Sequence, residues 1–287
     1  MTVEGQHGRL KVMNLVDWDA LRKAGFTLPD GADLPSLVGA AFTLLASPEA
    51  TARDEWAYAA LATWLTSGRL DEYLEDVGER ASHLLAAPEV QARSFAALVL
   101  AEVLARDARV RRLGAASLRT WQGAWARWYV QERDLRDWVD GLGWLHALAH
   151  GADVAARLAQ HPALTRVELL AVLATLTARL RDLPALPTQW EEDRLALAAF
   201  LLLRRPEVTP PDLTTWLGEL EALWRPLSGR PRTVVAAFAV QVARSLLVFA
   251  HLGAQLPGEA PVAAPPAPVL QKPLLAALRS AFPVYPA

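Results

Sequence analysis

The side chains best suited to chemistry lie in one short segment, DGLGWLHALAHGADVAARL, which begins at Asp140. Its apolar residues recur with helical spacing, so we expect one continuous helix over residues 138–160. Four polar residues of that helix, here called the polar stripe, fall within about 60° of one another at about 100° per residue: His146, His150, Asp153 and Arg157. Alanine and glycine surround them and leave little side-chain bulk nearby. The spacing predicts that two imidazoles, a carboxylate and a guanidinium project together toward something close by.

Two interpretations of the polar stripe need no metal. In the first, the stripe is a structural hydrogen-bond network between packed helices, in which Arg157 pairs with Asp153. In the second, it lines a pocket for a small anionic or polar ligand, with Asp140 and Trp144 as further binding residues. Histidine would supply hydrogen-bond donors that depend on its protonation, and arginine would supply a planar guanidinium with N–H donors in a fixed geometry. Both interpretations stay open at this point.

A third interpretation makes the stripe a metal site. His146 and His150 are four residues apart and point the same way on a helix, and Asp153 or Asp140 could be the third ligand. The zinc-peptidase mechanism is missing, because Ala147 stands where the glutamate of H-E-x-x-H would be. A divalent metal is therefore an alternative, and no cofactor is expected otherwise.

Other polar groups are candidates for supporting roles. Asp54 and Tyr58 lie one turn apart on an expected helix and can face each other, with Glu55 beside them. Asp193 opens another expected helix, where acidic residues need no function beyond meeting the helix dipole. Arg244 lies in the most apolar expected helix, so we expect its charge to be paired with a carboxylate. Its candidate partners are Asp140, Asp153 and Asp193.

Helical periodicity recurs along almost the whole chain, and the alternation typical of strands is nearly absent. Alanine and leucine abound, which favours helix intrinsically. Glycine and proline separate the expected helices, which cover residues 17–24, 34–45, 50–66, 70–86, 90–106, 115–132, 138–160, 166–181, 190–204, 211–223, 232–254 and 273–281. Short connections make neighbouring helices antiparallel. The predicted fold is all-α, an irregular stack of antiparallel helical hairpins like the HEAT or armadillo α-solenoids, without a clean repeat period.

Composition narrows the class of protein. The 287 residues are 53 % hydrophobic, enough for a sizeable core, and the formal net charge is -2. Because there is no basic excess, a nucleic-acid partner is disfavoured. The absence of cysteine excludes disulfides, thiolate metal sites and thiol nucleophiles. The polar N-terminal residues lack the order of a secretory signal, so we expect a cytoplasmic protein.

We expect a single helical domain over residues 1–256 and a tail over residues 257–287. The tail begins with a proline-rich stretch suited to an extended linker. It ends in a short amphipathic helix, which we expect to dock on its own chain rather than on a neighbour. The apolar stretch 233–252 is long enough to cross a bilayer. Arg244 near its middle would be costly in lipid, so we interpret this stretch as a buried core helix without a membrane partner.

The block DGLGWLHALAHGADV resembles the signature of a bacterial family known only as domain of unknown function 2785. RDEWAYAAL, from Arg53, is similar to its amino-terminal motif, and EEDRL and ARSL, from Glu191 and Ala243, are similar to later motifs. The resemblance implies an all-helical fold and a bacterial origin, with no established activity. It also implies that one set of residues acts as a unit: Asp140, Trp144, His146, His150 and Asp153. A second set is implied to gather near it: Asp54, Glu55, Asp193 and Arg244.

The leading functional hypothesis is a binding or scaffolding module that holds a small molecule, a protein or a peptide in a groove beside the polar stripe. The first alternative is a metal-dependent hydrolase, in which a divalent metal on His146, His150 and an aspartate would activate water. The second alternative is a helical-repeat DNA-binding or base-excision protein that uses tryptophans such as Trp121 and Trp125. Whether the protein is an enzyme stays open.

Overall fold

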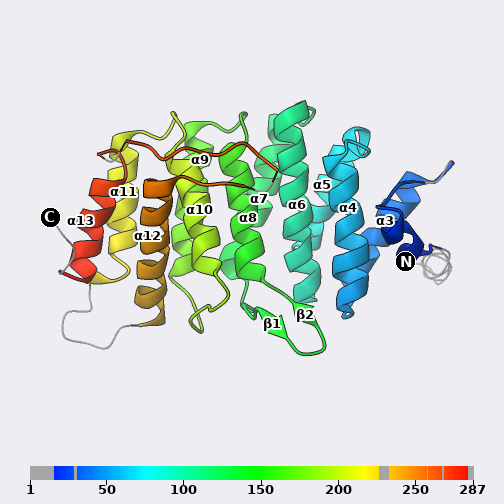
Figure 1. Ribbon diagram of the computed structural model, residues 1–287, viewed down its shortest axis with the longest axis horizontal. Coiled ribbons are helices and arrows are strands. Elements are labelled where there is room, and N and C mark those ends of the chain that lie inside the picture. Colours follow the sequence, from blue (N-terminus) through cyan, green and yellow to red (C-terminus); the bar gives the residue numbers. More distant parts are fainter. Residues whose placement is uncertain (1–15, 29–30, 226–232, 257, 267, 284–287) are drawn as a thin grey trace. The chain divides into compact units, whose positions relative to one another are not determined.

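The computed structural model describes residues 16–28, 31–225, 233–256, 258–266 and 268–283. Helices make up almost all of the regular structure in these residues, and the only sheet among them has two short strands (Figure 1). The all-α prediction is therefore confirmed. The chain divides into two compact units: unit 1 comprises Met1–Trp125 and Arg136–His150, and unit 2 comprises Ala126–Leu135 and Gly151–Ala287. The predicted division at residue 257 stays a prediction.

Unit 1 has a core of tryptophan, leucine and alanine side chains. Its elements are α2 (Trp18–Lys23), α3 (Leu34–Leu44), the π-helix η1 (Thr51–Tyr58), α4 (Ala59–Thr66), the 3-10 turn η2 (Asp71–Tyr73), α5 (Leu74–Leu84), α6 (Val90–Val110), most of α7 (Ala115–Gln131), the strands β1 (Trp138–Val139) and β2 (Gly143–Trp144), and the start of α8 (Ala147–Gln160). Helix α6 packs against both α4 and α5, and α3 packs against η1. Gly78 permits one close contact, because a Cβ at that position would overlap the Trp121 ring.

Unit 2 is also built from helices that pack side by side. Its elements are the end of α7, the rest of α8, α9 (Arg166–Leu180), α10 (Glu191–Leu203), α11 (Pro210–Glu221), α12 (Val234–Leu252) and α13 (Gln271–Ala281). The most extensive packing joins α10 to α12, and α13 lies against both α11 and α12. The C-terminal helix thus contributes Leu274 and Leu278 to the buried interior of unit 2.

Several helices begin where a local capping signal predicts. The Asp17 carboxylate accepts a hydrogen bond from the Ala20 N–H at 2.9 Å and caps α2. At the start of α11, Thr209 and Asp212 form a reciprocal capping box, with a proline in the first turn. These short-range interactions satisfy amide groups that the helix itself leaves without partners, so they fix helix ends independently of tertiary packing.

The predicted helix over residues 138–160 is wrong in its first third. Trp138 and Val139 pair with Trp144 and Gly143 in an antiparallel hairpin, and α8 begins only at Ala147. The turn contains Gly141 at φ 81° and Gly143 lies at φ 76°, in the left-handed region that favours glycine. Two such glycines disfavour helix and favour a tight turn, and this local preference prevailed over the apolar spacing.

Helix α12 is, among the described helices, long and apolar enough to cross a membrane by length and composition. In unit 2 it packs against α10 and α13 and buries Phe238, Val242 and Leu246. This packing fits the interpretation of α12 as a core helix. Arg244 is exposed on α12, and its predicted pairing with a carboxylate stays a prediction.

Candidate binding site

A continuous series of aromatic and imidazole rings runs through unit 1 from its surface into its core. The indoles of Trp138 and Trp144 meet edge to face, with ring centroids 5.1 Å apart. Trp144 meets His146 in the same manner at 4.4 Å, and the rings of His146 and His150 lie 5.8 Å apart. His150 then meets Phe95 edge to face at 5.4 Å. The series ends at Tyr58, whose ring centroid lies 6.0 Å from that of Phe95. We call these six residues the aromatic series.

His146 occupies the junction between the hairpin and α8. Its φ is 47°, in a region that residues with a Cβ rarely adopt. Its carbonyl oxygen accepts the hydrogen bond from the His150 N–H at 2.9 Å, so the first turn of α8 begins on His146. The two imidazoles are therefore neighbours, as the spacing predicted. A left-handed residue of this kind costs about 1–3 kcal/mol and is typical of functional sites.

The hydrogen bonds of Ser94 determine the tautomer of His150. The Ser94 hydroxyl on α6 donates to the carbonyl oxygen of Leu145 and also lies 2.7 Å from His150 Nδ1. A hydroxyl has a single proton, so Ser94 must accept its second hydrogen bond from an Nδ1–H group. The neutral imidazole of His150 consequently has its acceptor lone pair on Nε2. Ser94 is fully buried and its proton is committed to a carbonyl, which is unlike a serine nucleophile activated by histidine.

Arg53 holds the hairpin to η1 and was not predicted as a site residue. Its side chain is completely buried, and its guanidinium donates to the carbonyl oxygens of Ser47, Leu142 and Trp144 at 3.3, 2.8 and 3.3 Å. The same group lies 4.8 Å from the centroid of the Phe95 ring. The only sequence signal for this role is its position at the start of the R-D-E-W motif.

Local backbone features bring Arg53 close to the hairpin. Gly143 faces it, and a Cβ at that glycine would lie 3.0 Å from Ala50 Cβ and 3.4 Å from an Arg53 guanidinium nitrogen. Arg53 itself lies in η1, whose π-helical turns are rare and are frequent at functional sites. The hairpin and the π-helix thus approach each other more closely than bulky residues would permit.

The acidic and hydroxyl candidates of η1 have different environments. Asp54 is half-buried, and one of its carboxylate oxygens lies 2.7 Å from Arg53 Nε. Burial raises the pKa of the Asp54 carboxyl above its ordinary value, and the charge of Arg53 opposes this rise. Glu55 is exposed and forms an ion pair with Arg22 at 3.3 Å. The Tyr58 hydroxyl donates a long hydrogen bond of 3.4 Å to Glu102.

The other half of the polar stripe belongs to unit 2 and has partners there. Both carboxylate oxygens of Asp153 accept hydrogen bonds from Arg194, at 2.6 and 2.7 Å. Burial raises the pKa of the Asp153 carboxyl, and Arg194 opposes this effect. Arg157 forms an ion pair with Glu259, which also accepts a hydrogen bond from Gln160 at 2.7 Å. The predicted pairing of Arg157 with Asp153 is therefore wrong: Asp153 pairs mainly with Arg194, and Arg157 pairs mainly with Glu259.

The predicted site residues are distributed over both units. Asp140, Trp144, His146, His150, Asp54, Glu55 and Tyr58 belong to unit 1, whereas Asp153, Arg157, Asp193 and Arg244 belong to unit 2. Asp193 is half-buried in the first turn of α10. Within the described part of the chain, no three His, Asp or Glu side chains gather as a potential metal site. The roles proposed for these residues from the sequence stay predictions.

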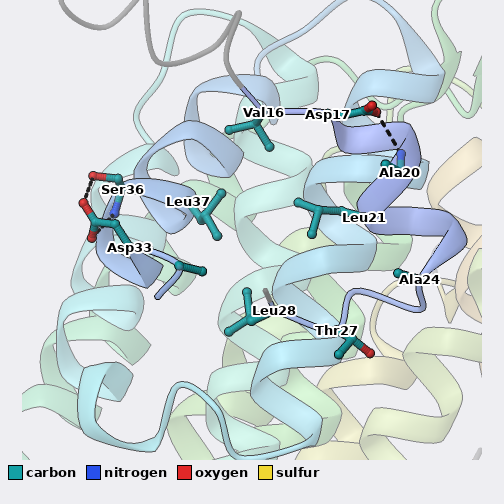
Figure 2. Close-up of a pocket in the computed structure, with 11 residues that line it drawn as sticks. Val16, Asp17, Ala20, Leu21, Ala24, Thr27, Leu28, Asp33, Ser36 and Leu37 are labelled. Carbon is teal, nitrogen blue, oxygen red and sulfur yellow. Dashed lines mark hydrogen bonds between the residues drawn. The ribbon is translucent and has the colours of Figure 1, made fainter. Parts of the chain in front are cut away.

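An apolar cavity of about 570 Å³ lies between α2 and α3 in unit 1 (Figure 2). Leu21, Leu28 and Leu37 point into it. Two acidic residues at its edge, Asp17 and Asp33, cap the two helices through backbone hydrogen bonds of 2.9 and 3.3 Å. Because these carboxylates are used for capping, the cavity offers mainly apolar walls to a ligand.

These features define an all-helical protein with a candidate binding site at a β-hairpin inserted before a helix. Residues 83–248 match the family model described as "Protein of unknown function (DUF2785)", and the chain belongs to that family. The matched segment contains α6, the hairpin, the polar stripe and α10, whereas the Arg53–Leu61 motif lies before it. No curated protein and no solved structure matches the chain.

Proposed function

We propose that this protein is a binding module whose ligand site is the surface end of the aromatic series. One observation carries the proposal: the rings form an unbroken series from Trp138, which is 52 % exposed, to Phe95, which is 3 % exposed. A large exposed indole normally leaves apolar surface in water, and such surface often marks an interaction site. Here a fully buried arginine and a strained backbone hold that surface in place, which is the preorganisation that binding favours.

The geometry supports binding better than hydrolysis. Ser94 is buried and donates its proton to a backbone carbonyl, so it lacks the features of a nucleophile. The two carboxylates with raised pKa values, Asp54 and Asp153, are both engaged by arginines. Partly exposed aromatic rings beside a fixed imidazole instead resemble the lining of small-molecule sites, where few polar groups set orientation.

The proposal extends to partners and architecture. The helices of each unit pack on their neighbours in sequence, as α5 does on α6 and α9 on α10, which supports a stack of hairpins related to α-solenoids. A small molecule, or a side chain of a protein or peptide, fits the size of the exposed indole pair. A net charge of -2 disfavours a nucleic-acid partner. We also propose that the protein is cytoplasmic.

Fluorine NMR of protein labelled with 5-fluorotryptophan tests the proposed site directly. The probes are a panel of amines, amino acids, carboxylates, nucleosides and sugar phosphates at millimolar concentration. We expect at least one class to shift the signals of Trp138 and Trp144 and to leave Trp190 unchanged. Trp190 is the matched control, because it is 72 % exposed and lies in unit 2. If no class moves Trp138 or Trp144, the proposal is wrong.

A further inference from the structure

We infer that the site binds an alkylated ammonium group, such as that of choline. This inference rests on the proposed function and names the chemical class of its ligand. The ligand would contact the faces of Trp138 and Trp144, with Asp140 supplying negative charge at the edge of the site.

The rings present two aromatic walls at nearly right angles. The planes of Trp138 and Trp144 are inclined by 75°, and those of Trp144 and His146 by 84°. Trp138 and Trp144 remain 52 % and 40 % exposed, so part of each indole is accessible to a ligand. The face of an indole carries negative potential and attracts cations, and tryptophan does so more strongly than tyrosine or phenylalanine. A corner of two such faces contacts a roughly spherical cation on two sides.

The hairpin adds negative charge to this corner. Asp140 is exposed and accepts a hydrogen bond from Trp138 Nε1 at 3.1 Å. Asp137 accepts a hydrogen bond from the Trp138 backbone N–H at 2.6 Å. The segment 137–144 contains these two carboxylates and no lysine or arginine, and Arg136 immediately precedes it. A carboxylate at the N–H edge of an indole makes the ring face more negative, so the hairpin favours a cation over an anion.

The positive charge that contacts the hairpin from the interior, that of Arg53, is directed away from the ligand. The Arg53 guanidinium is completely buried and donates to the carbonyl oxygens of Leu142 and Trp144. It therefore supports the hairpin backbone from the interior and does not occupy the exposed faces of the two indoles.

Hydration favours an alkylated ammonium over a primary one. A primary ammonium has three N–H donors that water satisfies. The aromatic faces offer no acceptor for them, and Asp140, which already accepts a hydrogen bond from Trp138 Nε1, can replace only part of those hydrogen bonds. A quaternary ammonium has no N–H donor, so it gives up less favourable hydration free energy when it leaves water. Aromatic sites recognise such groups for this reason.

The experiment compares tetramethylammonium and choline with 3,3-dimethyl-1-butanol, the neutral isostere in which carbon replaces nitrogen. The readout is the 5-fluorotryptophan spectrum of the full chain, titrated at constant ionic strength. We expect both cations to shift Trp138 and Trp144, with choline binding on the order of tenfold more tightly than the isostere. Sodium chloride at equal concentration controls for general salt effects.

Three variants separate this inference from the proposed function. Asp140→Asn keeps an oxygen acceptor for the indole N–H and removes the charge, and we expect it to weaken choline binding several-fold. Trp144→Leu should abolish the effect, and Trp190→Leu in unit 2 should leave it unchanged. Equal binding of choline and its isostere would overturn the cation inference while the binding module survives. If neither compound binds but another ligand class shifts Trp138, the inference fails alone; if no class does so, both fail.

Discussion

The ring of Tyr129 lies directly against the Cα of Gly151, so that a Cβ on this glycine would overlap two ring carbons. Tyr129 is 1 % exposed, and burial raises the pKa of its hydroxyl far above the ordinary value. The glycine of the H-G-A-D sequence is thus explained by packing within unit 2. It permits α7 and α8 to approach each other at the tyrosine.

Gly151→Ala is expected to lower the free energy of unfolding by about 1–3 kcal/mol, because the buried ring must shift to accommodate the methyl group. This cost exceeds the gain of roughly 1 kcal/mol that alanine brings to a helix interior. Gly218→Ala in α11 is the matched control, since nothing lies within 4 Å of a Cβ there. We expect the control to be stabilised. Urea denaturation measures both, and stabilisation of both variants would contradict the packing argument.

Arg53→Met should destabilise the protein by about 3 kcal/mol, because three backbone carbonyls and the Asp54 carboxylate would lose their partner. Amide exchange at Leu142 and Trp144 should accelerate more than exchange elsewhere. Arg53→Lys should recover only part of the lost stability, since lysine lacks the planar guanidinium with its several N–H donors. Arg22→Met removes a partly exposed arginine with two ion pairs and should cost less than about 1 kcal/mol.

The tautomer of His150 is accessible to nitrogen NMR. We expect the neutral ring to carry its proton on Nδ1 in the wild-type protein. Ser94→Ala removes the acceptor of that proton, so the Nε2–H form should gain population and stability should fall by about 1 kcal/mol. Ser117→Ala, whose hydroxyl bonds Glu75 at an exposed position, should leave the His150 signals unchanged. A predominant Nε2–H form in the wild type would refute the assignment.

The pH dependence of stability should contain a contribution from Asp212. Its hydrogen bonds from Arg166, and then from Thr209, hold the pKa of this carboxyl well below the ordinary value of 3.8. A pKa depressed by folding gives stability that is present above the unfolded value and is lost as the pH falls below about 4. Asp212→Asn retains the capping oxygen and should flatten the stability curve in that acidic range. Arg166→Met should flatten it in the same way, and an unchanged slope in both variants would contradict the assignment.

Arg157 and Glu259 should be energetically coupled. Their side chains are 18 % and 17 % exposed, and their ion pair joins α8 to the C-terminal segment within unit 2. A double-mutant cycle of Arg157→Met and Glu259→Gln should give about 1–3 kcal/mol of coupling. The exposed pair Arg133 and Asp182 is the control and should give less than about 1 kcal/mol. Equal coupling in the two cycles would mean that burial does not strengthen the first pair.

Local sequence signals were sufficient to predict the helical class and most helix positions. Apolar spacing and caps such as Thr209 with Asp212 act within a few residues, so they can be recognised without the fold. The same local pattern predicted that the imidazoles of His146 and His150 would be neighbours, because residues four apart on a helix face the same way. It failed at residues 138–146, where the backbone freedom of Gly141 and Gly143 produced a hairpin.

The partners of these residues depend on long-range packing, which local patterns do not specify. Ser94 meets His150 across 56 positions of sequence, and Arg53 meets Trp144 across 91. Glu259 reaches Arg157 across 102 positions, from a tail that was expected to be an extended linker. Such contacts depend on which helices pack together. Burial of apolar surface drives that packing, and because it is non-directional, it does not specify which distant segment a helix will contact. Periodicity therefore predicts which face of a helix is buried, and the packed structure decides what that face meets.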